Sequence, residues 1–144
     1  MLFVIGIAAT SNGSVVVNEM ELNPPDSGSN WVELCNSGNV TVDISGWSAV
    51  ITDGSWVGRM SAPDGTAIPP DGFYVLNGNP LWNHDNGGFV TLYSESGAAI
   101  DKTPDRKDLL NNDFTWGRHP DGHDTKTEGD WGFAYATKGR PNQI

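Results

Sequence analysis

Hydrophobic and polar residues alternate with a period of two along most of this chain. In the stretch 30–36, for example, Val32 and Leu34 lie on one side of an extended backbone, and Trp31 and Glu33 lie on the other. Such runs, rich in Val, Ile, Thr and aromatic residues, are typical of β-strands. They predict strands at 14–20, 30–36, 40–44, 47–52, 56–60, 72–77, 88–94, 97–101, 114–118 and 131–136.

Turn-forming residues separate these runs at short intervals, as at 63–65 and 120–122. Each turn combines a Pro, which presets φ, with Asp and Gly residues that tolerate tight bends. Closely spaced strands with such turns favour a sandwich or a barrel. Helix signals are confined to 103–112, where Thr103 suits an N-cap and Pro104 suits the first turn. The chain is therefore predicted to be all-β, with at most one short helix near 103–112.

The alternation also predicts which side chains enter the core. If Val32 and Leu34 face inward, Glu33 lies on the outer face with its charge near water. By the same argument Ile44 faces inward and Asp43 faces outward. Tryptophans at the ends of these strands are expected to act as packing anchors.

Length and composition indicate one folded domain. The 144 residues can bury a single core, and a chain that is 37% hydrophobic and 18% charged is too apolar to be disordered. Residues 1–9 are nearly all apolar, but a membrane-spanning helix needs about 20 such residues, so we expect no membrane span. The segment 1–13 is thus either a first strand or a truncated signal peptide, and the domain occupies 14–144.

The chain is acidic, with eighteen Asp and Glu against eight Lys and Arg and a net charge of −10. This charge repels phosphate backbones and anionic lipid, so nucleic-acid binding is disfavoured. The single cysteine, Cys35, excludes an internal disulfide and a thiolate metal cluster. Within its alternating run, Cys35 is expected to be a buried small hydrophobe.

The densest cluster of potential metal ligands spans 119–124 and contains His119, Asp121, His123 and Asp124. The two imidazoles with nearby carboxylates suit a divalent cation, and a bound cation would suit a metal-binding accessory domain or a small hydrolase. The Pro-Asp-Gly turn between the histidines leaves their geometry undefined. A solvated hairpin loop is the alternative, and we favour it.

Glu19 and Glu33 lie in adjacent predicted strands and could face each other as a carboxylate pair. Two close carboxylates raise one pKa, which is how acid–base pairs arise in enzymes. The simpler hypothesis is structural: each accepts hydrogen bonds from turn amides, with Arg118 or Arg106 as a possible ionic partner. We favour this structural role and predict no catalytic residue and no cofactor.

Oxygen-rich loops at 23–30, 83–86 and 111–113 offer carboxylate, amide and carbonyl oxygens, which are the ligands that Ca²⁺ prefers. The spacing of an EF-hand loop is absent from the chain. Calcium is therefore a weak candidate ligand.

An ordered series of short motifs runs from about Val15 to Asn142. Its most distinctive part is Trp-Val-Glu-Leu at 31–34, followed by Val-Asp-Ile-Ser-Gly-Trp at 42–47. In this order the motifs resemble the lamin-tail domain in its prokaryotic form. The residues that carry the resemblance are Asn18, Glu19, Trp31, Glu33, Asn36, Asp43, Gly46, Trp47, Trp116, Arg118 and Asn142.

The resemblance implies an immunoglobulin-like β-sandwich of Greek-key type without the usual disulfide. It also implies a non-catalytic binding module on a secreted or cell-surface protein, although a cytoplasmic location stays open. One departure is visible at 137–142, where Thr-Lys-Gly-Arg-Pro-Asn replaces the family's frequent Thr-Pro-Gly-x-x-Asn. The terminal turn is therefore expected to differ.

Binding by such a module needs exposed side chains, and three aromatic residues lie beside Gly and Asn in predicted loops or edges: Trp56, Trp82 and Phe89. We expect them either to contact a protein or glycan partner or to cover the open ends of the sandwich. An unpaired edge strand also offers a route to a homodimer.

Overall fold

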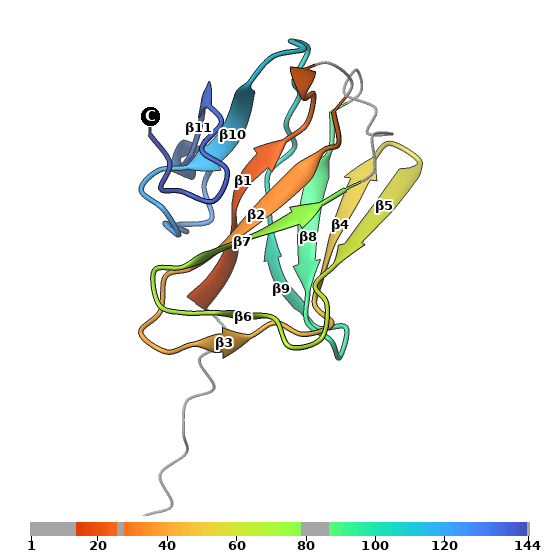
Figure 1. The fold of residues 1–144 in the computed structure, drawn as a ribbon. Coiled ribbons are helices and arrows are strands. Elements are labelled where there is room, and N and C mark those ends of the chain that lie inside the picture. Colours follow the sequence, from red (N-terminus) through yellow and green to blue (C-terminus); the bar gives the residue numbers. More distant parts are fainter. Residues whose placement is uncertain (1–13, 26–27, 79–86, 144) are drawn as a thin grey trace, which may run out of the picture.

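The computed structural model describes residues 14–25, 28–78 and 87–143, and Figure 1 shows two β-sheets packed face to face. The predicted N-terminal segment 1–13 lies outside the described residues. Within them, a five-stranded sheet has the order β11-β10-β1-β2-β7 and a four-stranded sheet has the order β5-β4-β8-β9. A small sheet pairs β3 with β6.

The strands of the five-stranded sheet are β1 (Val15–Glu21), β2 (Trp31–Asn36), β7 (Phe73–Asn77), β10 (Phe114–Arg118) and β11 (Trp131–Tyr135). Those of the four-stranded sheet are β4 (Ser48–Asp53), β5 (Trp56–Ser61), β8 (Phe89–Tyr93) and β9 (Ala99–Lys102). The small sheet contains β3 (Val42–Asp43) and β6 (Ala67–Ile68), and the 3-10 turn η3 spans Glu128–Asp130.

All paired strands in the described residues are antiparallel, and the chain crosses between the two large sheets after β2, β5, β7 and β9. Such exchange of strands is the Greek-key connection of β-sandwiches. Each predicted strand overlaps an observed one. The strand β6 was missed because two residues are too few to show an alternation.

The window 103–112 contains no helix. Thr103 and Val90 are bonded twice: the Thr103 amide donates to the Val90 carbonyl, and the Val90 amide donates to the Thr103 hydroxyl, each at 2.9 Å. Further along, Arg106 forms a bridge with Gly88. These long-range bonds hold the segment extended, and they outweigh its local capping signals.

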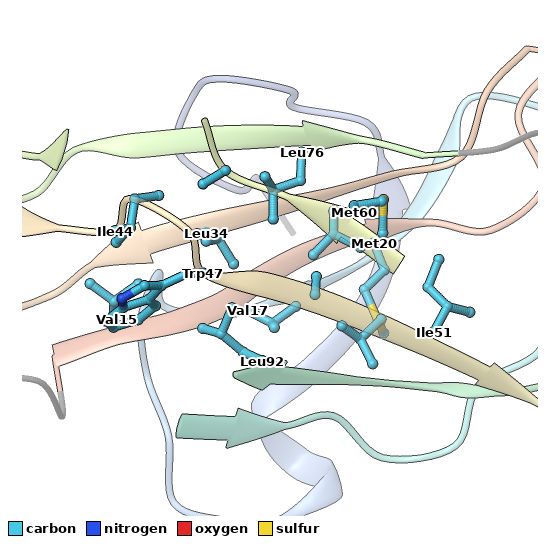
Figure 2. Close-up of a cluster of buried hydrophobic side chains, with 14 of the residues drawn as sticks. Val15, Val17, Met20, Leu34, Ile44, Trp47, Ile51, Met60, Leu76 and Leu92 are labelled. Atoms are coloured by element: carbon cyan, nitrogen blue, oxygen red, sulfur yellow. The ribbon is translucent and has the colours of Figure 1, made fainter. Parts of the chain in front are cut away.

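The core fills the space between the two sheets (Figure 2). Val32, Leu34 and Ile44 face it as the alternation predicted, and Asp43 is exposed. The close-up labels ten of the buried side chains: Val15, Val17, Met20, Leu34, Ile44, Trp47, Ile51, Met60, Leu76 and Leu92.

A β-bulge at Asn18 sets the geometry of the opposite face of β1. Val17 pairs with Leu34 and Glu19 pairs with Glu33, so Asn18 is the extra residue. A bulge places two consecutive side chains on the same side of a strand. Asn18 and Glu19 therefore both point to the outer face of the five-stranded sheet, where their bonding partners lie.

The expectation that Glu33 lies near water was wrong. Glu33 does lie on the face opposite Val32 and Leu34, but its exposed fraction is 0%. The C-terminal segment 136–143 lies over this outer face and bonds to it. Alternation predicts the side of the sheet on which a residue lies, but it does not reveal what covers that side.

Candidate interaction surfaces and the buried polar network

Glu19 is held by the strand β10 and by the C-terminal segment. Its carboxylate accepts hydrogen bonds from the Thr115 hydroxyl at 2.6 Å, the Thr137 amide at 2.8 Å and the Thr137 hydroxyl at 3.0 Å. The cavity beside Glu19 has a volume of about 10 Å³, which is room for a single water molecule. A substrate therefore has no access to this carboxylate.

Glu33, directly opposite Glu19, accepts hydrogen bonds from the Asn18 side-chain amide at 3.2 Å and from the Gly139 backbone amide at 2.6 Å. Gly139 has a φ of +77°, a conformation that L side chains rarely adopt. This conformation is part of the tight turn in which the Arg140 amide donates to the Thr137 carbonyl. The predicted bonding of both glutamates by turn amides is confirmed.

Burial raises the pKa of Glu19, and it raises the pKa of Glu33 to about 7 and that of Glu21 to about 8. The predicted ionic partners were wrong. Arg106 stacks on the Trp116 ring at 4.8 Å from its centroid, and Arg118 lies on the other side of the sheet. Hydrogen bonds alone therefore compensate for the burial of these carboxyl groups.

Arg118 joins the two sheets. From β10 its guanidinium reaches Asp101 on β9 at 3.0 Å, and its Nε donates to the Val17 carbonyl at 2.7 Å. The Val17 amide in turn donates to Asp101 at 2.9 Å. These Val17 groups face away from β2, and the ladder between β1 and β10 pairs only Glu19 and Met20, so Val17 is available to both side chains. The ring of Trp131 lies 4.7 Å from the guanidinium and shields the pair from water.

The proposed metal ligands at 119–124 are used in other ways. Asp121 accepts hydrogen bonds from the Asn18 side chain and the Asn142 amide, each at 3.0 Å. Asp124 pairs with Arg118 at 3.2 Å and also with Lys126. The part of the chain that the structure describes contains no group of three His, Cys, Asp or Glu residues that could hold a metal ion.

The histidines of this loop lie at the surface. His119 is exposed, and its backbone amide donates to the Asp130 carbonyl at 2.8 Å. The imidazole Nε2 of His123 is 3.7 Å from the Asp130 carboxylate. Neither the metal-binding nor the hydrolase hypothesis gains support from this arrangement.

Cys35 is buried, as expected, and burial raises the pKa of its thiol to about 12. Other motif residues shape local turns. The Asn36 side chain donates to the carbonyls of Val40 and Ile68, each at 2.8 Å, and thereby ties β2 to the small sheet. The Asp43 carboxylate accepts the Ser45 amide at 2.9 Å.

The three predicted binding aromatics have different positions. Trp56 packs against the core, and its ring lies over Gly58, where a Cβ would be 2.3 Å from it. Phe89 lies half-buried on the outer face of β8, with the Lys102 ammonium 4.1 Å from its ring centroid. Trp82 lies outside the described residues.

The outer face of the four-stranded sheet, which we call the open face, contains the side chains opposite to the core positions Ile51 and Val90. Val57, on the edge strand β5, is 62% exposed. The register aligns Val57, Thr52 and Phe89 in one row across three strands. The open face is formed by Ser48, Val50, Thr52, Val57, Arg59, Ser61, Phe89, Thr91, Tyr93 and Lys102, of which Ser48 and Val50 are buried.

Sequence reasoning missed Val57 as a candidate surface residue. Its neighbouring strand β4, Ser-Ala-Val-Ile-Thr-Asp, is apolar on both sides and gives no clear alternation. It also missed the partners of Arg118, because Asp101 is 17 residues away and Val17 is 101 residues away. Only proximity in the fold reveals these contacts.

A scan of protein-family models matches the lamin tail domain over residues 8–113, well over half of the chain. The chain belongs to the lamin tail domain family. A comparison with curated proteins gives no match. The family supports a role as a non-catalytic protein-interaction module, and its immunoglobulin-like β-sandwich is the fold observed here.

In this lamin tail domain the family match ends at residue 113, before β10. The five-stranded sheet nevertheless continues with β10 and β11. The strand β10 supplies Thr115, and the segment 136–143 supplies Thr137 and Gly139, which bond the two glutamates. No helix in the described residues has the length and hydropathy needed to cross a bilayer.

Proposed function

We propose that this lamin tail domain is a non-catalytic module of a secreted or cell-surface protein, and that it binds an acidic protein surface through the open face. The observation that carries the proposal is the exposure of Val57, 62%, on the edge strand β5, in one cross-strand row with Thr52 and Phe89. Exposed apolar patches on sheets commonly mark interaction sites.

Charge supports an acidic partner. The chain has a net charge of −10, yet the open face carries Arg59 and Lys102 and no Asp or Glu. The acidic residues of the same strands, Asp53 and Asp101, point inward and are buried. Complementary potentials steer association and exclude wrong partners, so an acidic protein surface suits this face.

The rest of the polar chemistry supports a non-catalytic role. The carboxylates of Glu19 and Glu33 and the guanidinium of Arg118 are bonded within the fold. The extracellular location rests on the resemblance to prokaryotic members of the family on secreted and surface proteins.

A photo-cross-linking experiment tests the proposal. Val57 is replaced by p-benzoylphenylalanine, and the domain is irradiated in an extract of the source cells and their medium. We expect a specific adduct with an acidic protein that excess unlabelled domain prevents and that the double variant Arg59→Glu, Lys102→Glu abolishes.

A matched probe at Val40, 44% exposed in the loop between β2 and β3, serves as the control. If position 40 yields the same adduct as position 57, or if position 57 yields none, the open face is not the binding surface. An adduct with a glycan or a neutral protein that survives the charge reversal would refute the acidic partner.

A further inference from the structure

The edge strand β5 has backbone groups directed away from its sheet. The Ala62 amide donates to the Trp47 carbonyl at 2.8 Å, so this pair is hydrogen-bonded. Hydrogen-bonded and non-bonded pairs alternate in an antiparallel ladder, and the regular register with β4 continues that alternation along β5. The amides and carbonyls of Val57, Arg59 and Ser61 therefore face the outer edge. Figure 1 shows no described strand beyond β5, and these groups form no hydrogen bond with the described residues.

The same three residues supply side chains to the open face. Side chains alternate along a strand, and Trp56 and Met60 of β5 pack against the core. Val57 is 62% exposed on the opposite side, and Arg59 and Ser61 are exposed beside it. A segment that lies along β5 therefore meets main-chain donors and acceptors together with exposed side chains.

Arg59 gives this edge a positive charge that no carboxylate of the described residues neutralises. Its guanidinium donates to the Ser48 hydroxyl and forms no ion pair within the described ranges. Lys102, in the same cross-strand row, lies over the Phe89 ring and likewise has no carboxylate partner there. Opposite charges that face each other on neighbouring strands stabilise a sheet, so an acid suits the position opposite Arg59.

The same charge disfavours a second copy of β5 as the added strand. The antiparallel register that uses all three outward-facing residues places Arg59 of one copy opposite Arg59 of the other. Like charges directly opposite each other destabilise strand pairing, and a charged residue on an edge strand commonly prevents self-association. Two chains of charge −10 also repel each other as whole molecules. The edge therefore favours a strand of opposite charge.

We propose that the partner of the open face adds an acidic extended segment to β5, as an antiparallel fifth strand of this sheet. This inference rests on the proposed function and specifies its binding mode. Each of the three outward-facing residues forms a hydrogen-bonded pair, which gives about six main-chain bonds. An acidic side chain of the segment lies opposite Arg59 and an apolar one lies opposite Val57. In this mode the main-chain bonds supply affinity and the two side-chain contacts supply specificity.

Amide hydrogen exchange of the full chain with the peptide Ac-Thr-Thr-Glu-Thr-Val-Thr-Thr-NH2 tests strand addition. In the antiparallel register its Glu lies opposite Arg59 and its Val lies opposite Val57. We expect the peptide to slow exchange at Val57, Arg59 and Ser61 and to leave Gly58 and Met60 unchanged, because their amides already bond to β4. N-methylation of the peptide's Glu and Val, whose amides face β5, should abolish binding. N-methylation of the Thr between them is the control and should not.

A charge exchange tests the acidic occupant. The wild type should bind this peptide about fivefold more tightly than the peptide with Lys in place of Glu, and Arg59→Glu should reverse the preference. Since the Arg59 side chain is exposed, the variant is expected to fold, and circular dichroism checks this. Lys107→Glu, in the exposed loop between β9 and β10, changes the net charge equally and should keep the wild-type preference.

Unchanged exchange at the three amides at millimolar peptide, or binding that survives N-methylation of the Glu and Val, overturns strand addition. Equal binding of the two peptides overturns the acidic occupant. Protection that appears without peptide and grows with protein concentration identifies a second copy instead. If Val57 cross-links an acidic protein that leaves the three amides unprotected, the proposed function stands and strand addition fails. If position 57 yields no adduct, the proposed function fails, whatever the peptide does.

Discussion

The outer faces of the two sheets differ in what covers them. On the five-stranded sheet, residues 136–143 cover Glu19, Trp31 and Glu33, whose exposed fractions are 1%, 6% and 0%. On the four-stranded sheet, Val57 on the open face is 62% exposed. The covered face carries the carboxylates and the open face carries the cations and apolar residues. A polar strand position can thus be more deeply buried than an apolar one, when a later segment supplies its hydrogen-bond donors.

The largest expected effect is on the free energy of unfolding. Removing a charged side chain buried between the sheets should lower it much more than removing one on the open face. Arg118→Met leaves Asp101 buried without its partner and should lower the free energy of unfolding by about 3–5 kcal/mol. Arg59→Met, on the open face, should change it by less than about 1 kcal/mol. Urea unfolding of both variants measures the difference, and equal losses would refute the distinction.

The covered face should also make stability depend on pH. The pKa of Glu33 is raised from 4.5 to about 7 and that of Glu21 to about 8, so from about pH 4.5 to 8 the folded chain binds more protons than the unfolded chain. The free energy of unfolding should therefore be highest at the acidic end of this range and fall as pH rises through it.

Urea unfolding at pH 5.5 and pH 8 measures this dependence, and Glu33→Gln should reduce it because the variant has no proton to lose at that position. A stability that instead rises between these two pH values, or a slope that Glu33→Gln leaves unchanged, would show that Glu33 is ionised throughout.

A smaller effect is expected at the turn that covers Glu33. Gly139→Ala introduces a side chain at a φ of +77° and should cost about 1–2 kcal/mol. The control is Gly129→Ala, where φ is not positive and a Cβ would meet only the Thr127 hydroxyl at 3.7 Å. Thermal unfolding compares the two, and a similar shift in both would contradict the role of the turn.

The smallest effect on stability is expected on the open face. Val57→Lys should change the free energy of unfolding by less than about 0.5 kcal/mol, because the side chain is already exposed. The same substitution should weaken partner binding at least tenfold, as measured by titration against the cross-linked partner once that partner is identified. A variant that binds as tightly as the wild type would remove Val57 from the interface.

Several features of the covered face could be predicted from local pattern. The opposition of Glu19 and Glu33 follows from two adjacent alternating runs, and bonding to turn amides follows from the turn-forming residues that recur along the chain. The residues that bond to Glu33 and to Arg118 could not be predicted. Gly139 lies 106 residues from Glu33, and Arg118 was assigned to the glutamates although it lies on the opposite side of the sheet.

By itself, the sequence determined the strands, the sides of each strand and the family, because a period of two and turn residues act over a few neighbours. Only the tertiary structure decided which polar residues are buried, which edge stays unpaired and which face stays open. The physical reason is that burial and hydrogen-bond partnership depend on segments brought together from distant parts of the chain. The segment 136–143 shows this most clearly, since it turns two surface positions into the most deeply buried acids of the fold.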